Sequence, residues 1–101
     1  MEWRGRKVLV TGGASFIGSH LVDALVERGG TVRVVDNLSS GHLENIKPHI
    51  EAGRVEFHRG DLLDQAVVNT AVAGISLVFH LAADHGGRGY VDLHQVACAT
   101  N

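Results

Sequence analysis

The sequence predicts an α/β fold, in which a parallel sheet is flanked by helices. Short apolar segments rich in β-branched residues alternate with stretches of helical spacing, which is the pattern of βαβ units. A glycine-rich segment, Thr11 to Gly18, lies directly between the first apolar run and the first helical stretch. Because parallel crossovers are right-handed with few exceptions, these observations predict a sheet of about four strands in the order 3-2-1-4.

The first predicted strand and helix lie on either side of the glycine-rich segment. Residues 7–10 predict the first strand, because they contain the short, continuous apolar run Val8-Leu9-Val10 expected of a buried parallel strand. From residue 16 to residue 28 apolar side chains recur at helical spacing, and a pair of glycines then supplies a helix stop. Residues 31–35 predict the second strand, which Asp36 ends.

The second half of the chain continues the alternation. After a polar turn, Ser39-Ser40-Gly41 is suitable capping material for a short helix over residues 42–52, broken or kinked near Pro48. The remaining elements are a third strand (54–58), a third helix (64–72), a fourth strand (75–80) and the start of another helix (91–101). The resulting strand order is that of the first half of a Rossmann sheet and a little more, within a single domain over residues 1–101.

Composition and charge exclude several functional classes. The net charge of −2 gives no electrostatic basis for binding nucleic acid or an anionic membrane surface. No apolar run approaches the roughly 20 residues of a membrane span, and the first residues lack the apolar core of a signal peptide. Cys98 is the single cysteine, so no disulfide can form within the chain. The sequence therefore predicts a protein of the reducing cytoplasm.

The glycine-rich segment is the strongest functional signal. At the junction of a strand and a helix, backbone N–H groups and the helix dipole favour the pyrophosphate of a dinucleotide. Asp36 stands 18 residues beyond Gly18, where a carboxylate can accept hydrogen bonds from the adenosine ribose. The same carboxylate would repel a 2′-phosphate, so the sequence predicts NAD rather than NADP. A tight turn followed by a strand-end Asp is the purely structural alternative.

Four segments match known sequence motifs. Residues 11–21, TGGASFIGSHL, are similar to the signature TGGAGFIGSHL, and residues 36–41 are DNLSSG. Residues 60–64, GDLLD, resemble GDxxD, and residues 78–83, VFHLAA, match V-x-H-L-A-A. With these motifs, which cover nearly the whole chain, the sequence resembles the extended short-chain dehydrogenases/reductases, the family of nucleotide-sugar epimerases and dehydratases. The resemblance implies a Rossmann-like NAD-binding domain that is incomplete relative to the family.

The resemblance also implies which residues contact NAD. The glycine-rich loop would hold the pyrophosphate, the DNLSSG loop the adenosine ribose and the GDLLD segment the adenine. The end of the fourth strand would run beside the nicotinamide ribose and the pyrophosphate. The implied cofactor-binding residues are Gly12, Ser15, Phe16, Ile17, Gly18, Asp36, Asn37, Asp61, Leu62, Leu81, Ala82 and Ala83.

Ser15 departs from the family signature, which has glycine at this position. A Cβ and a hydroxyl here could crowd the pyrophosphate. Alternatively, serine is a good helix N-cap and could donate to a phosphate oxygen. We expect cofactor binding that is weakened but survives.

The segment from Asp84 to Tyr90 follows the fourth predicted strand, at the edge where open α/β sheets bind ligands. It resembles the D-x-G-G-x-G loop of GDP-mannose 3,5-epimerases. That resemblance implies a substrate role for Gly86, Gly87 and Arg88, with Arg88 meeting a nucleotide-sugar phosphate. An ordinary glycine loop is the alternative.

No catalytic residue and no metal site are predicted. Family members use a Tyr-x-x-x-Lys helix, whereas Tyr90 is the single tyrosine and is followed at the fourth position by His94. The histidines lack the spacing of zinc ligands. The resemblance thus implies the NAD-binding part of a nucleotide-sugar epimerase or dehydratase that is inactive alone, with a nucleotide sugar as substrate only in a full-length context.

Other interpretations concern function and assembly. The chain could be a non-catalytic dinucleotide-binding module, or a truncated remnant without function. The predicted fourth strand would leave an unpaired apolar edge, and such edges promote pairing with a second copy. We therefore expect a homo-oligomer or a marginally stable monomer.

Overall fold

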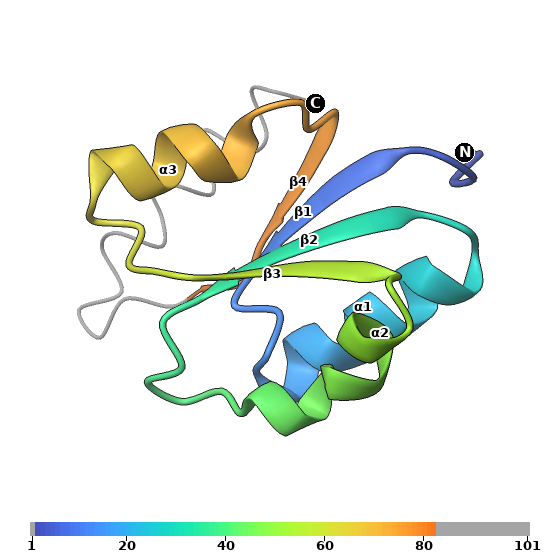
Figure 1. Ribbon diagram of the computed structural model, residues 1–101, viewed down its shortest axis with the longest axis horizontal. Coiled ribbons are helices and arrows are strands. Elements are labelled where there is room, and N and C mark those ends of the chain that lie inside the picture. The colour runs from blue at the N-terminus through green and yellow to red at the C-terminus, as the bar shows by residue number, and fades with distance from the viewer. Residues whose placement is uncertain (1, 83–101) are drawn as a thin grey trace.

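A computed structural model describes residues 2–82 and confirms the predicted α/β architecture (Figure 1). Within these residues, four parallel strands form one sheet in the predicted order β3-β2-β1-β4. The strands are β1 (Lys7–Thr11), β2 (Thr31–Asp36), β3 (Val55–Arg59) and β4 (Leu77–His80). The helices are α1 (Phe16–Glu27), α2 (Lys47–Glu51) and α3 (Gln65–Val72), with a short 3-10 helix, η1 (Leu43–Asn45), before α2.

Helices cover both faces of the sheet, with α1 and α2 on one face and α3 on the other (Figure 1). The larger core lies on the α1 face, where Val10 and Val34 of the strands are fully buried with Val22 of α1. The core beneath α3 is much smaller. Its buried members are Leu9, Val35 and Ala71. Hydrophobic burial therefore anchors α3 less firmly than α1.

Predicted and observed element boundaries differ by a residue or two, and capping side chains explain several of them. Ser15 caps α1, since its hydroxyl accepts the N–H of Gly18 at 3.0 Å. Asp64 caps α3 by accepting the N–H of Ala66 at 2.9 Å, so the helix begins one residue later than predicted. Gly29, with a φ of 88°, ends α1 as expected.

The helix expected over residues 42–52 consists of two short elements, η1 and α2. The break falls at Ile46, whose side chain is fully buried in the larger core. Pro48 lies in the first turn of α2, where its missing N–H has no helical partner to lose. The capping role expected of Ser39-Ser40-Gly41 is wrong, because His42 is the N-cap of η1 and makes no side-chain capping bond.

The carboxyl ends of the parallel strands lie along one edge of the sheet, on the left of the view in Figure 1. The loops that leave β1, β2 and β3 at this edge carry most of the predicted cofactor contacts. Ligands of open α/β sheets bind outside such an edge. The expected helix over residues 91–101 lies outside the described residues.

Two further expectations concern membrane spans and self-association. None of the helices in residues 2–82 is long and apolar enough to cross a membrane. On its outer side, β4 pairs with no strand in that part of the chain. Self-association through this edge stays a prediction.

Candidate functional site

At two positions of the glycine-rich loop (residues 11–18), a side chain would collide with backbone atoms. Gly12 has a φ of 71°, and a Cβ there would lie 2.9 Å from the backbone nitrogen of Ala82. A Cβ on Gly18 would lie only 2.2 Å from the carbonyl oxygen of Gly12. Backbone packing thus requires glycine at both positions, and it brings the start of α1 close against the end of β1.

The hydroxyl of Ser15 links the two ends of the glycine-rich loop by hydrogen bonds. Its Oγ donates to the carbonyl oxygen of Gly12 at 2.8 Å and accepts the N–H of Gly18 at 3.0 Å. Its φ of −72° is ordinary extended backbone, so the main chain does not require glycine here. A hydroxyl has one proton, and Ser15 donates it to Gly12. The N-cap interpretation is therefore confirmed, and donation to a phosphate oxygen would require breaking the bond to Gly12.

The first turn of α1 presents the backbone N–H groups of Phe16 and Ile17. The first amides of a helix have no intrahelical acceptor, and the Ser15 hydroxyl takes up that of Gly18. The side chains of Phe16 and Ile17 are 75% and 71% exposed, which places this turn at the surface. Together with the helix dipole, these amides suit a phosphate group.

Asp36, at the end of β2, ties the glycine-rich loop to the loop that follows β2. The residue is only 8% exposed. Its Oδ2 accepts the N–H of Ala14 at 3.0 Å, and its Oδ1 accepts the N–H of Leu38 at 2.8 Å. Gly41 approaches so closely that a Cβ there would lie 2.9 Å from Oδ2. Each carboxylate oxygen keeps a second lone pair, which is the acceptor that a ribose hydroxyl needs.

The loop after β2 is a strained turn. Leu38 has a φ of 64°, a left-handed conformation that costs a non-glycine residue on the order of 1 kcal/mol. The bond from its N–H to Asp36 stabilises this conformation. Next to it, the side-chain carbonyl of Asn37 accepts the N–H of Ser39 at 2.9 Å. The predicted ribose contacts Asp36 and Asn37 thus also build the turn that presents them.

The predicted adenine contacts lie beside the end of β2. The N–H of Gly60 donates to the backbone carbonyl of Asp36 at 3.2 Å, which brings the following residues, Asp61 and Leu62, to this part of the edge. Asp61 is exposed and accepts the N–H of Leu63 at 2.9 Å. Leu62 is half-buried against the smaller core. Leu62 therefore offers an apolar surface next to an exposed carboxylate.

Thr11 joins the ends of β1 and β4 and was missed among the predicted contacts. Its Oγ1 accepts the N–H groups of Leu81 and Ala82 at 3.0 and 3.2 Å and forms a hydrogen bond with Nδ1 of His80 at 2.6 Å. Leu81 and Ala82 consequently lie against the glycine-rich loop. Thr11 is the first residue of the family signature, and this position could have indicated its role in the site. Ala83 and the predicted substrate residues lie outside the described part of the chain.

Asn45 of η1 was missed as well. Its Nδ2 donates to the carbonyl oxygen of Ala14 at 2.7 Å, and the N–H of His42 donates to the same oxygen at 3.0 Å. The side-chain contact joins residues 31 positions apart, so no local pattern indicates it.

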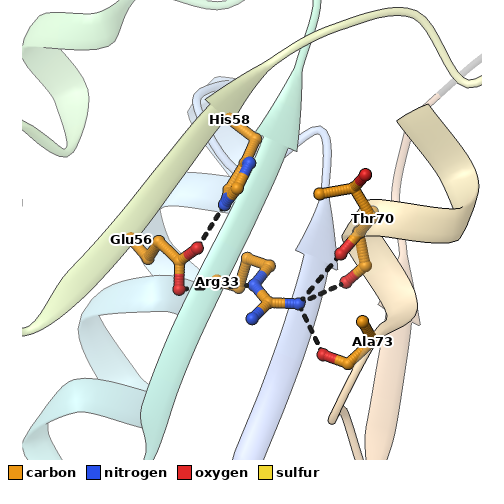
Figure 2. A network of polar contacts seen from close by, with 6 residues as sticks. Arg33, Glu56, His58, Thr70 and Ala73 are labelled. Atoms are coloured by element: carbon orange, nitrogen blue, oxygen red, sulfur yellow. Dashed lines mark hydrogen bonds and ion pairs between the residues drawn. The ribbon is translucent and has the colours of Figure 1, made fainter. Parts of the chain in front are cut away.

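A polar network attaches α3 to the sheet on the face opposite α1 (Figure 2). Nη1 of Arg33 donates to three carbonyl groups at the end of α3, between Thr70 and Ala73, at 2.8 to 3.2 Å. Nε of Arg33 lies 3.4 Å from Oε1 of Glu56, which also pairs with His58. The hydrogen bond from His58 and the charge of Arg33 lower the pKa of Glu56. The network fixes the helix that follows the predicted adenine contacts.

The opposite edge of the sheet is a poor candidate for the site. A shallow depression there is lined by Glu2, Arg4, Arg6, Lys7 and Ser76, among others. It lies at the amino ends of the strands, whereas parallel α/β sheets bind ligands at their carboxyl ends. In residues 2–82, no three His, Cys, Asp or Glu side chains come together as metal ligands would.

The geometry of the carboxyl edge defines the class of protein: a dinucleotide-binding α/β domain. The model of the NAD dependent epimerase/dehydratase family matches residues 8–98. This chain belongs to that family, which confirms the resemblance of its motifs.

Curated relatives share this region although their names describe different reactions. UDP-glucuronic acid decarboxylase 2 of Arabidopsis thaliana is 42% identical over 82 residues, which cover 81% of this chain and 17% of the relative. A putative UDP-glucose 4-epimerase of Methanocaldococcus jannaschii is 38% identical, over 84% of this chain and 27% of the relative. The chain thus spans about a quarter or less of the length of these relatives.

Solved structures agree with the fold. Epimerase Mth375 from Methanothermobacter thermautotrophicus matches with a TM-score of 0.75 and 38% identity, over 94% of this chain and 28% of that one. The Bordetella bronchiseptica enzyme WbmF, solved in complex with NAD⁺ and UDP, matches with a TM-score of 0.71 and 38% identity, over 81% of this chain and 24% of that one. Both support the Rossmann-like arrangement of the sheet.

Proposed function

We propose that this chain is the NAD-binding part of a nucleotide-sugar epimerase or dehydratase. The observation that carries the proposal is the position of Asp36, whose buried carboxylate joins the glycine-rich loop to the loop after β2. The relatives differ in reaction but share this region, so the cofactor is what they have in common. The family is described as NAD dependent, and WbmF was solved with NAD⁺.

In this proposal, each part of the carboxyl edge of the sheet contacts a different part of NAD⁺. The N–H groups at the start of α1 bind the pyrophosphate, and the glycines let it approach the backbone. The carboxylate of Asp36 accepts the ribose hydroxyls, while Leu62 packs against the adenine. The end of β4, held by Thr11, runs beside the nicotinamide ribose. When bound, NAD⁺ supplies a hydride acceptor for a sugar carbon.

Asp36 also accounts for the choice between the two cofactors. The 2′-phosphate of NADP⁺ would lie next to a carboxylate that is 8% exposed and therefore poorly screened by solvent and salt. We expect this chain to bind NAD⁺ at least about 10-fold more tightly than NADP⁺, because a hydrogen bond to a charged group contributes roughly 1.5–3 kcal/mol.

Asp36→Asn tests the proposal by calorimetric titration with both cofactors. The amide has one acceptor oxygen in place of two, so we expect NAD⁺ affinity to fall about 10-fold or more and the preference over NADP⁺ to shrink. Asp23→Asn is the matched control, since Asp23 is an exposed residue of α1 that pairs with His49. Equal NAD⁺ affinity in wild type and Asp36→Asn would refute the assigned role.

We also propose that this chain alone does not convert a nucleotide sugar. Residues 1–101 contain no Tyr-x-x-x-Lys sequence, the acid/base motif of the family. We therefore expect NAD⁺ binding without conversion of a nucleotide sugar, which becomes a substrate only in a full-length context. Incubation of the chain with NAD⁺ and UDP-glucose should produce neither a new sugar nucleotide nor NADH absorbance. The substrate role of Gly86, Gly87 and Arg88 stays part of this proposal.

A further inference from the structure

We infer that Asn45 is a positioning residue for the cofactor, which sets the spacing between the glycine-rich loop and the ribose-binding loop after β2. This inference rests on the proposed NAD site. Nδ2 of Asn45 donates to the carbonyl oxygen of Ala14 at 2.7 Å, a short hydrogen bond between neutral groups. Ala14 is fully buried, so its carbonyl depends on partners within the protein.

The end of β2 and the segment that follows it contact both polar groups of Ala14. The N–H of Ala14 donates to Oδ2 of Asp36 at 3.0 Å, while its carbonyl accepts from Asn45 and from the N–H of His42. The residue that follows is Ser15, the N-cap of α1. The position of Ala14 therefore determines where the first turn of α1, with its phosphate-binding amides, lies relative to the ribose site.

The backbone of Asn45 is held within η1. Its own N–H donates to the carbonyl of His42 at 3.0 Å, which closes the turn of η1. The next residue, Ile46, is fully buried in the larger core and anchors η1 to the sheet. The Asn45 amide thus connects the glycine-rich loop to η1, which is anchored in the core. In the sequence, the ribose-binding loop with the strained Leu38 lies between these two segments.

Ligands that span both loops should depend on this spacing more than ligands that contact one loop. ADP-ribose carries the pyrophosphate and the adenosine ribose, and it needs both loops in register. Adenosine occupies only the ribose and adenine positions. A change at Asn45 that leaves the ribose loop folded should therefore weaken ADP-ribose binding selectively, which a general loss of structure would not do.

The decisive variant is Asn45→Asp, which keeps the shape of the side chain and places a carboxylate oxygen against the carbonyl of Ala14. We expect the Kd of ADP-ribose to rise about 10-fold or more, while the Kd of adenosine changes less than about 3-fold. Asn45→Ala leaves the N–H of His42 on the carbonyl, so we expect the same selectivity with a smaller rise. Titrations followed by NMR measure both ligands in the folded 101-residue chain.

Asn69→Asp is the matched control, because Asn69 is exposed on α3 and pairs with Gln65 of the same helix. It should leave both dissociation constants unchanged. If Asn45→Asp does not fold, Asn45→Ala decides the question. Wild-type affinity for ADP-ribose in folded Asn45 variants, or an equal loss of both ligands, would overturn the inference while leaving the proposed function intact. Failure of the wild-type chain to bind ADP-ribose or NAD⁺ would instead overturn the proposed function, and the inference with it.

Discussion

The two faces of the sheet are stabilised by different kinds of interaction. On the α1 face, the glycine-rich loop is closed by backbone contacts and by two short side chains, Ser15 and Asp36. On the α3 face, the long side chain of Arg33 reaches the carbonyl groups at the end of α3 and is held in turn by Glu56 (Figure 2). The first arrangement leaves little space and uses few charges, whereas the second depends on charge.

This difference shows where the domain tolerates change. The loop that would meet the cofactor should be sensitive to added volume, because backbone atoms occupy the space around its glycines. The attachment of α3 should be sensitive to loss of charge and to pH, because few of its residues are buried.

The largest effect is expected for Gly18→Ala. The new Cβ would lie 2.2 Å from the carbonyl oxygen of Gly12, so the loop or the helix must move. We expect loss of NAD⁺ binding and a decrease of roughly 3 kcal/mol in the free energy of unfolding. Urea denaturation and calorimetric titration measure both.

Gly53→Ala is the control for this experiment. Gly53 has a φ of 75°, but a Cβ there would meet no atom within 4 Å. Its cost should be the strain alone, about 1 kcal/mol, with NAD⁺ binding retained. Normal NAD⁺ affinity in Gly18→Ala would mean that the close contact does not shape the site.

Arg33→Met should give the next largest effect, and it should act on the other face. The carbonyl groups at the end of α3 lose their donor, and Glu56 loses its cation. We expect a decrease of about 1–3 kcal/mol in the free energy of unfolding. Amide hydrogen exchange should accelerate in α3 more than in α1. Equal acceleration in both helices would show that the two faces are not independently stabilised.

Ser15→Ala should have a moderate effect on the glycine-rich loop. The variant loses the N-cap of α1, which contributes about 1 kcal/mol to the free energy of unfolding. Because the hydroxyl is bonded within the loop, NAD⁺ affinity should fall only a few-fold. A much larger loss of affinity with unchanged stability would instead indicate that Ser15 contacts the phosphate. Thermal denaturation with and without NAD⁺ separates these outcomes.

The smallest effect expected is the pH dependence of the free energy of unfolding that arises from Glu56. The bond from His58 and the charge of Arg33 lower the pKa of Glu56 below its ordinary value of 4.5. A lowered pKa in the folded state stabilises the protein above pH 4.5, and this contribution is lost as the pH falls through the folded-state pKa. Because the Glu56 side chain is 55% exposed, the contribution should be about 0.2–1 kcal/mol. Unfolding by urea between pH 6 and pH 3 (roughly the range in which carboxylates titrate) should show it.

Glu56→Gln provides the comparison for that measurement. The variant cannot lose a proton, so its stability should change less with pH over this range than that of the wild type. Identical profiles would contradict the role assigned to the Arg33–Glu56–His58 network.

Most of the fold was predictable because each element has a local signal. The apolar run before the glycine-rich loop, the glycine pair after α1 and the N-capping side chain of Asp64 all act within a few residues of where they stand. The spacing from Gly18 to Asp36 was likewise sufficient to indicate the carboxylate at the end of β2.

The rest could not be predicted because it depends on contacts between distant residues. The bond from Asn45 to Ala14 spans 31 positions, and those from Arg33 to the end of α3 span 37 to 40. Neither residue stands out locally, since an Asn near a turn and an Arg in a strand have many possible partners. Ser15 is an intermediate case: the sequence indicated its N-cap role, which the structure confirms, whereas its effect on cofactor binding stays a prediction.

We propose that the carboxyl edge forms a working NAD site with Asp36 as its ribose acceptor. Thermal unfolding of the wild-type chain with NAD⁺, with NADP⁺ and without ligand tests it most directly. At about 100 times its Kd, a ligand adds roughly 2.7 kcal/mol to the free energy of unfolding. We predict a clear rise in Tm with NAD⁺ and little or none with NADP⁺ at the same concentration. A cooperative transition that neither cofactor shifts would show that the carboxyl edge does not bind NAD⁺.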